Sequence, residues 1–198
     1  MKKFFLSSFL AFGILSVNSV FQENAFSQSK KTESNKEVKV SNNPLMMAIE
    51  IADIKEIKKL IAKGHSVNSK DQNGFTALMS ASNKGYKDIT DLLTSLGADV
   101  NLKDNSGKTA LMYSSNNGND MIVANLIKMG AGAGVNIKDN SGKTAIMYAS
   151  ENGHKEIVSV LLGIGAEIKS KDKYGNTALT YANKKNHQAI VELFESIE

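Results

Sequence analysis

Two short runs in the sequence have the residue types of a phosphate-binding loop. Ser-Gly-Lys-Thr begins at Ser106 and again at Ser141, and in such loops backbone N–H groups and a lysine hold the phosphates. The full motif also needs a glycine five positions before the first glycine of each run. Those positions hold Leu102 and Ile137, and neither run has a strand-to-helix context, so the sequence argues against nucleotide binding.

Other residues that could do catalysis or bind a metal are few. The chain has three histidines, His65, His154 and His187, none of them near a nucleophile-elbow pattern. It has no cysteine, which excludes a disulfide, a thiolate zinc site and a cysteine nucleophile. The run from Asp139 lacks the spacing of a calcium loop, whose twelfth position here is Ser150 rather than glutamate. We therefore expect no catalytic residue, no cofactor and no metal ligand of these kinds.

The methionines are the other group with possible chemistry. Met46, Met79, Met112 and Met147 recur at one position of a repeating pattern. Thioethers can bind Cu(I) or absorb oxidant, so one alternative is an envelope accessory or stress-protection protein that uses these residues for metal binding or oxidant scavenging. Packed helices lie about 8–10 Å apart, which separates thioethers in successive units. Core filling is favoured, because methionine adapts to irregular gaps.

The residues above belong to a sequence pattern that is repeated along the chain. Thr-Ala-(Leu/Ile) begins at Thr76, Thr109, Thr144 and Thr177, in steps of 33, 35 and 33 residues. A period of about 20–50 residues is typical of stacked supersecondary units. Sparse aromatic content, at 7%, fits layers of aliphatic residues that contact only neighbouring layers. The sequence therefore predicts a solenoid.

Each repeat reads as a turn, a short helix, a tight connection and a longer helix. An aspartate followed three residues later by glycine predicts a tight turn, and the threonine two residues after that glycine predicts a helix N-cap. Glycines such as Gly85 and Gly97 are expected to end the first and second helix. The segment from Gly130 to Val135 has two residues more than its counterpart, which predicts either a tolerated loop bulge or a bend in the binding face. The turn aspartates are Asp71, Asp104, Asp139 and Asp172.

The best-formed unit, Asp139 to Ala166, resembles the ankyrin repeat, with its pattern D-x-x-G-x-T-P-L-H-x-A-A-x-x-G-H-x-x-I-V-x-L-L-L-x-x-G-A. The family proline is replaced by alanine in four units and remains only at Pro44. The family histidine after the leucine is methionine in most units. The resemblance implies an all-α solenoid of five stacked helix–turn–helix repeats with β-turn or hairpin fingers, and a non-catalytic protein–protein interaction module. The matching residues are Thr144, Ile146, Ala149, Gly153, His154, Ile157, Val158, Leu161, Leu162, Gly165 and Ala166.

Three segments of the chain have different compositions. Residues 1–27 read as a signal peptide, with Lys2 and Lys3 before an apolar run that is too short to span a bilayer comfortably. Cleavage is expected after Ser27, with Ser19 or retention as alternatives. After removal of this segment we expect no membrane span, and a periplasmic or secreted location. Residues 28–41 read as a flexible linker, and 42–198 as the repeat domain, with units at about 42–70, 71–103, 104–138, 139–171 and 172–198.

The positions that differ between units predict where a partner binds, since their alike positions form the core. The net charge is +4, carried by lysine without arginine, which makes nucleic acid a poor candidate partner. We expect a monomer that binds another protein, with Phe75 and Tyr174 as exposed aromatic anchors. The lysines suggest an acidic partner surface, unless they serve only to solvate the face. The candidate positions are Gln72, Asn73, Phe75, Lys84, Asn105, Lys108, Asn117, Asn140, Lys143, Glu151, Lys173, Tyr174, Lys184 and Lys185.

Overall fold

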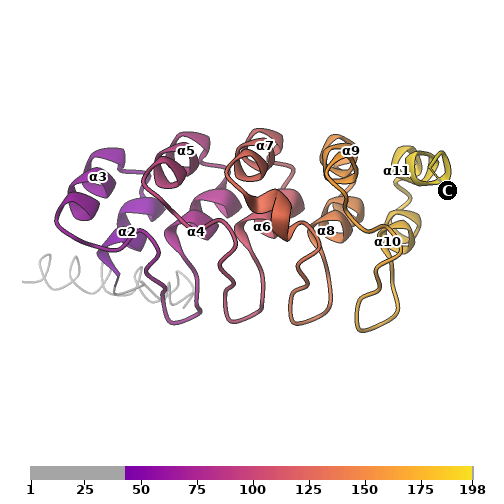
Figure 1. Cartoon of the computed structure of the whole chain (residues 1–198), viewed down its shortest axis with the longest axis horizontal. Coiled ribbons are helices and arrows are strands. Elements are labelled where there is room, and N and C mark those ends of the chain that lie inside the picture. Colours follow the sequence, from indigo (N-terminus) through magenta and orange to yellow (C-terminus); the bar gives the residue numbers. More distant parts are fainter. Residues whose placement is uncertain (1–42, 198) are drawn as a thin grey trace, which may run out of the picture. The chain divides into compact units, whose positions relative to one another are not determined.

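The computed structural model describes residues 43–197 as a row of helix pairs (Figure 1). The predicted signal peptide and linker lie outside the described residues. Within each pair the first, shorter helix is here called inner and the second outer. The inner helices are α2 (Pro44–Glu50), α4 (Ala77–Lys84), α6 (Ala110–Asn116), α8 (Ala145–Asn152) and α10 (Ala178–Lys184). The outer helices are α3 (Ile54–Ala62), α5 (Lys87–Ser95), α7 (Asp120–Lys128), α9 (Lys155–Gly163) and α11 (Gln188–Glu195).

Successive pairs stack on one another along the chain. Each inner helix from α4 to α8 packs against the inner helix before it and the one after it, and the outer helices form a second row above them (Figure 1). The loops between pairs project away from both rows as fingers. This arrangement confirms the predicted all-α repeat solenoid, in which layers bury their apolar sides against neighbouring layers.

The predicted helix ends are confirmed by the backbone. Asn43 and the threonine before each later inner helix are N-caps, and Thr76 Oγ1, for example, accepts from the N–H of Met79 at 3.3 Å. Thr144 is the exception, because its hydroxyl has no hydrogen-bond partner although it is buried. Gly85 and Gly153 end α4 and α8 in the left-handed conformation, which glycine adopts at little cost.

The fingers are tight turns organised by their aspartates. Asp71 Oδ1 accepts from the backbone N–H groups of Asn73 and Phe75, both at 2.8 Å, and the Asp71 N–H donates to the Phe75 carbonyl at 2.9 Å. The same bonds recur at Asp104, Asp139 and Asp172. The predicted Asp-x-x-Gly turn is therefore present in four of the units.

The core runs through the inner helices and the inward side of the outer helices. Met46, Met79, Met112 and Met147 are all buried in it, which agrees with their expected role in core filling. The two-residue insertion forms a short 3₁₀ helix, η1 (Ala131–Gly134), which packs on α7 through buried Ala131. The insertion is therefore absorbed locally.

Two features are absent from residues 43–197. No helix in this range is both long and apolar enough to cross a bilayer. No three or more histidine or acidic side chains in the same range come close enough together to hold a metal ion.

Candidate protein-interaction surface

The four finger turns and the adjoining side of the inner helices are here called the finger face. The turns are residues 71–75, 104–108, 139–143 and 172–176. In three units a tyrosine of the inner helix bonds the turn aspartate of its own finger. Tyr148 Oη donates to Asp139 Oδ2 at 2.6 Å. Tyr113 donates to Asp104, and Tyr181 to Asp172, both at 2.5 Å. In these three units the Asp–Tyr bond therefore ties the finger to the inner helix that follows it.

The ionisation of these pairs is held in one state. Burial, together with the hydrogen bond to a charged aspartate, raises the pKa of Tyr113, Tyr148 and Tyr181. Burial alone would raise the pKa of Asp139 and Asp172, but hydrogen bonds from tyrosine and backbone outweigh it. They lower the pKa of Asp139, and that of Asp172 to about 2. The proton therefore stays on tyrosine, as a structural bond requires.

Lysines lie between the tyrosines of neighbouring units. Lys108 Nζ is 5.5 Å from the ring centroid of Tyr113 and 4.9 Å from that of Tyr148. Lys143 Nζ is 5.1 Å from the Tyr148 centroid and 4.1 Å from that of Tyr181. These are cation–π distances, so each lysine joins two units. Lys143 also pairs with Glu151 at 2.6 Å.

Two sequence expectations about this surface need correction. Phe75 is not an exposed anchor, because its ring is half-buried and packs edge-to-face on Tyr113 with centroids 4.9 Å apart. The lysines are not all available to a partner either. Lys84 pairs with Glu50 at 2.9 Å, and Lys108 and Lys143 are held by the tyrosines. Both differences arise because tyrosine rings and glutamates of the folded chain contact these residues.

The asparagines of the finger face also hold the units together. Asn105 donates from its backbone to the Asn73 carbonyl at 2.9 Å and from Nδ2 to the Gln72 carbonyl at 3.0 Å. Asn140 Nδ2 donates to the Asn105 carbonyl at 2.9 Å, and Asn117 Nδ2 to an inner-helix carbonyl one unit earlier at 2.6 Å. Their side chains are engaged, although they lie at the surface.

Four candidate residues at the end of the array stay accessible. Tyr174 is 81% exposed at the tip of the last finger. Lys173, Lys184 and Lys185 are exposed around it, and none of the three forms an ion pair within residues 43–197. Lys184 Nζ donates only to the side-chain oxygen of Asn176, at 2.7 Å. We call these residues (Lys173, Tyr174, Lys184 and Lys185) the C-terminal cluster.

Two histidines serve the stacking of units. The Nε2 atoms of His154 and His187 lie 3.1 and 3.0 Å from the backbone carbonyls of Asn116 and Glu151, each in the preceding unit. Both acceptors lie near the end of an inner helix, Asn116 in α6 and Glu151 in α8. Both rings are thereby assigned a structural role.

The sequence pattern alone does not predict the Asp–Tyr bonds. In three units, however, a tyrosine lies nine residues after the turn aspartate. That repeated spacing was the available signal. It becomes interpretable only when the finger is known to fold back over the start of the inner helix.

Comparison with known proteins agrees with this architecture. A family model described as ankyrin repeats (three copies) matches residues 20–104, 45–139, 81–172 and 122–196. Two ankyrin repeat proteins of Rickettsia felis, RF_p14 and RF_pd14, are each 39% identical over 51 residues. The aligned part is 26% of this chain and 81% and 77% of the two relatives. Ankyrin repeats are in general scaffolds for protein–protein interaction, and this chain belongs to the ankyrin repeat family.

Proposed function

We propose that the protein is a non-catalytic, exported scaffold that binds an acidic surface of another protein through its finger face, centred on the C-terminal cluster. The observation that carries the proposal is the 81% exposure of Tyr174 beside three exposed lysines. Aromatic residues ringed by polar ones are frequent centres of protein interfaces. Elsewhere on the face the aromatic rings and several lysines are occupied by contacts within the array.

The charge of the cluster sets the expected partner chemistry. Lys173 and Lys185 have no hydrogen bond or ion pair at Nζ within residues 43–197. The carboxylate closest in sequence, Asp172, is occupied by Tyr181 and by backbone N–H groups. An acidic partner surface would supply the missing counter-charges and would speed association at low salt. We therefore expect the affinity to fall as ionic strength rises.

Charge-reversed variants test this assignment. The partner is first captured by crosslinking in the cells that produce the protein, and its affinity is then measured with purified components. Tyr174→Ala, and Lys173→Glu combined with Lys185→Glu, are expected to fold normally and to weaken binding at least about fivefold, since buried interface anchors typically contribute about 1 kcal/mol or more. The matched control reverses Lys128 and Lys155, which are exposed on outer helices. If the control variant lost as much affinity for the partner as the cluster variants, the site assignment would be refuted.

Export rests on residues 1–27 alone, through the charged start and the short apolar run. The proposed destination is the periplasm or the medium. Mass spectrometry of the protein recovered from these fractions should find an N-terminus at Gln28, or at Val20 if the earlier site is used. Deletion of residues 1–27 should keep the protein in the cytoplasm. Full-length protein beginning at Met1 and confined to the cytoplasm would refute export without affecting the binding test.

A further inference from the structure

The unit formed by α10 and α11 has an apolar hollow that no other described unit covers. Leu78, Leu111 and Ile146 occupy one position of the inner helix and are buried, whereas Leu179 at the same position of α10 is half-exposed. The difference arises because no described unit packs beyond α10 and α11. An apolar surface that the fold normally covers is thus accessible at this end.

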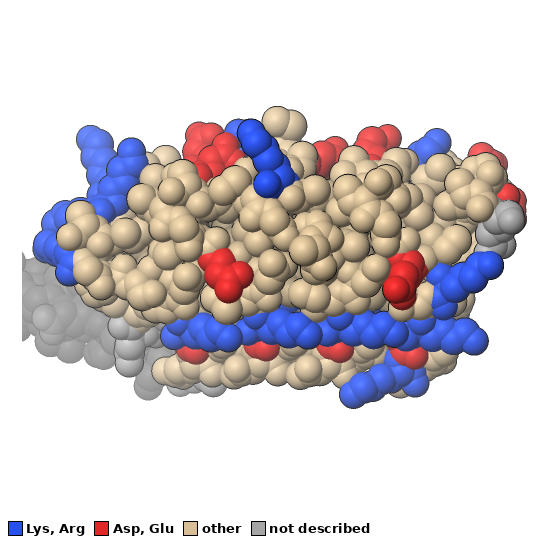
Figure 2. Space-filling model, in the orientation of Figure 1, with Lys and Arg blue, Asp and Glu red and all other residues tan. Residues whose placement is uncertain are grey.

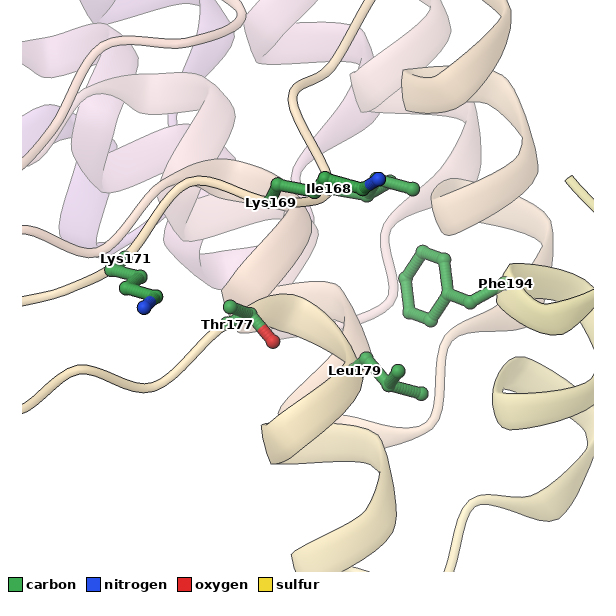
Figure 3. Close-up of a pocket in the computed structure, with 6 residues that line it drawn as sticks. All are labelled: Ile168, Lys169, Lys171, Thr177, Leu179 and Phe194. Carbon is green, nitrogen blue, oxygen red and sulfur yellow. The ribbon is translucent and has the colours of Figure 1, made fainter. Parts of the chain in front are cut away.

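The hollow has a volume of about 280 Å³ and lies between residues 168–171, α10 and α11 (Figure 3). Its floor is apolar, and Figure 3 shows the Phe194 ring and the Leu179 side chain on one side of it. Pockets for drug-sized ligands are typically about 300–1,000 Å³. The size therefore suits one inserted side chain better than a cofactor. The lining residues are Ile168, Lys169, Lys171, Thr177, Leu179 and Phe194.

A row of lysines lies along the bases of the fingers, and their ammonium groups donate hydrogen bonds to backbone oxygens of the next unit. Lys70, Lys103 and Lys138 each donate from Nζ to the backbone carbonyl of the lysine one unit further on, at 2.8, 3.1 and 2.9 Å. Figure 2 shows a continuous blue band running along the array. Lys171 is the last acceptor in this row. Its own Nζ has no hydrogen bond or ion pair within residues 43–197.

Lys171 and the hollow together therefore present two of the features that join successive units in the array. One is an ammonium that can donate to a polypeptide oxygen, and the other is an apolar surface. Lys169 adds a second exposed ammonium without a partner in the described range. No acidic side chain of the described residues lines the hollow. A carboxylate-bearing polypeptide satisfies this combination better than a neutral one, because an ammonium bonds a carboxylate more strongly than an amide oxygen.

Two basic segments of the chain are poor candidates for this end. Residues 53–63 of the first unit contain four lysines and two acidic residues. The predicted linker, residues 28–41, also has four lysines and two glutamates. Both have a net positive charge, which Lys169 and Lys171 would repel. Charge complementarity therefore favours an acidic polypeptide of another protein, and self-association is the result expected in the tests below if a second copy binds instead.

We propose that the hollow is a second docking site, which takes one aliphatic or aromatic side chain of a partner protein between Leu179 and Phe194 and flanking carboxylates against Lys169 and Lys171. It lies apart from the finger tips, and it does not depend on the C-terminal cluster being a binding surface. A single partner could occupy both sites, because Lys171 and Lys173 are separated by one residue.

Short fluorescein-labelled peptides test the site with the full chain. One peptide carries a leucine flanked by glutamates, a second replaces the glutamates with glutamines, and a third replaces the leucine with serine. We expect saturable binding of the first peptide, and weaker binding of the others by on the order of tenfold or more. Methyl NMR signals of Ile168 and Leu179 should shift on addition of the first peptide. Equal affinity for all three peptides, or no saturation by the first, would overturn the proposal.

Protein variants test whether the peptide binds at the hollow rather than at another lysine-rich surface of the array. Lys171→Gln and Lys169→Gln should weaken binding of the first peptide, whereas Lys155→Gln on the outer face of α9 should not. Tyr174→Ala tests the C-terminal cluster, and it should leave peptide binding to the hollow unchanged. Three further results would contradict the proposal: binding of octanoate in place of peptide, concentration-dependent self-association that is lost in Lys171→Gln, and peptide binding that survives both lysine substitutions.

Discussion

The Asp–Tyr bond of the fourth unit gives the sharpest prediction about stability. Tyr148→Phe removes the hydroxyl that donates to Asp139 at 2.6 Å and leaves the buried ring in place. A hydrogen bond to a charged group typically contributes about 1.5–3 kcal/mol. Asp139 keeps three other donors, the Ser141 and Lys143 backbone N–H groups and the Ser141 hydroxyl. We therefore expect the loss to stay within that range.

Urea unfolding followed by circular dichroism measures the effect at pH 7. A protein of this size should also melt about 3–12 °C lower, at roughly 2–4 °C per kcal/mol. Tyr174→Phe is the matched control, since that ring is exposed and its hydroxyl has no partner within residues 43–197; its effect should stay within about 0.5 kcal/mol. If Tyr148→Phe proved as stable as Tyr174→Phe, the bond would not fix the finger as we argue.

Three further predictions concern the same fold. Because the pKa values of Asp139 and Asp172 are lowered, their contribution to the free energy of unfolding is present above about pH 4 and is lost as the pH falls through the folded values. The raised tyrosine pKa values contribute stability that is lost as the pH rises above about 10. The free energy of unfolding, measured from pH 2 to 11, should show both losses, and each loss should be smaller in Tyr148→Phe. Ser115→Ala should raise the free energy of unfolding by about 1 kcal/mol, because the Ser115 hydroxyl is buried without a partner. Ser114→Ala is the control and should not raise it, because that hydroxyl bonds two carbonyls. A lower free energy of unfolding in Ser115→Ala would contradict the bonding shown here. Gly118→Ala should destabilise the protein by more than about 1 kcal/mol, because φ is +71° and the new Cβ would lie 2.6 Å from the His154 ring. Gly163→Ala, with open space around the new Cβ, should instead stabilise α9 by about 0.5–1 kcal/mol. The same urea titration measures both changes in the free energy of unfolding.

Much of the fold could be predicted from the sequence because each unit carries its own local signals. Thr76 as an N-cap, Gly85 as a helix end and the turn at Asp71 depend on residues within one unit, and repetition removed the ambiguity of each signal. The buried methionine position was predicted in the same way. These features involve short sequence separations, where residue type and spacing decide the outcome.

The candidate surface was harder to predict because its contacts join different units. Phe75 reads as an exposed turn residue, but Tyr113 of the next unit covers it. Lys108 reads as a free charge, but it lies over the ring of Tyr148, again one unit away. Equivalent positions in the repeats do not reveal how the side chains of one unit lie against the next. The sequence therefore overestimates how much of the proposed face is free.

Hydrogen–deuterium exchange of the protein, alone and bound to its captured partner, shows which surface the partner covers. We expect slower exchange in the last finger and at the start of α10, with the outer helices α5 and α7 unchanged. Slower exchange confined to α5 and α7, with the fingers unaffected, would contradict the assignment of the finger face as the surface that binds protein.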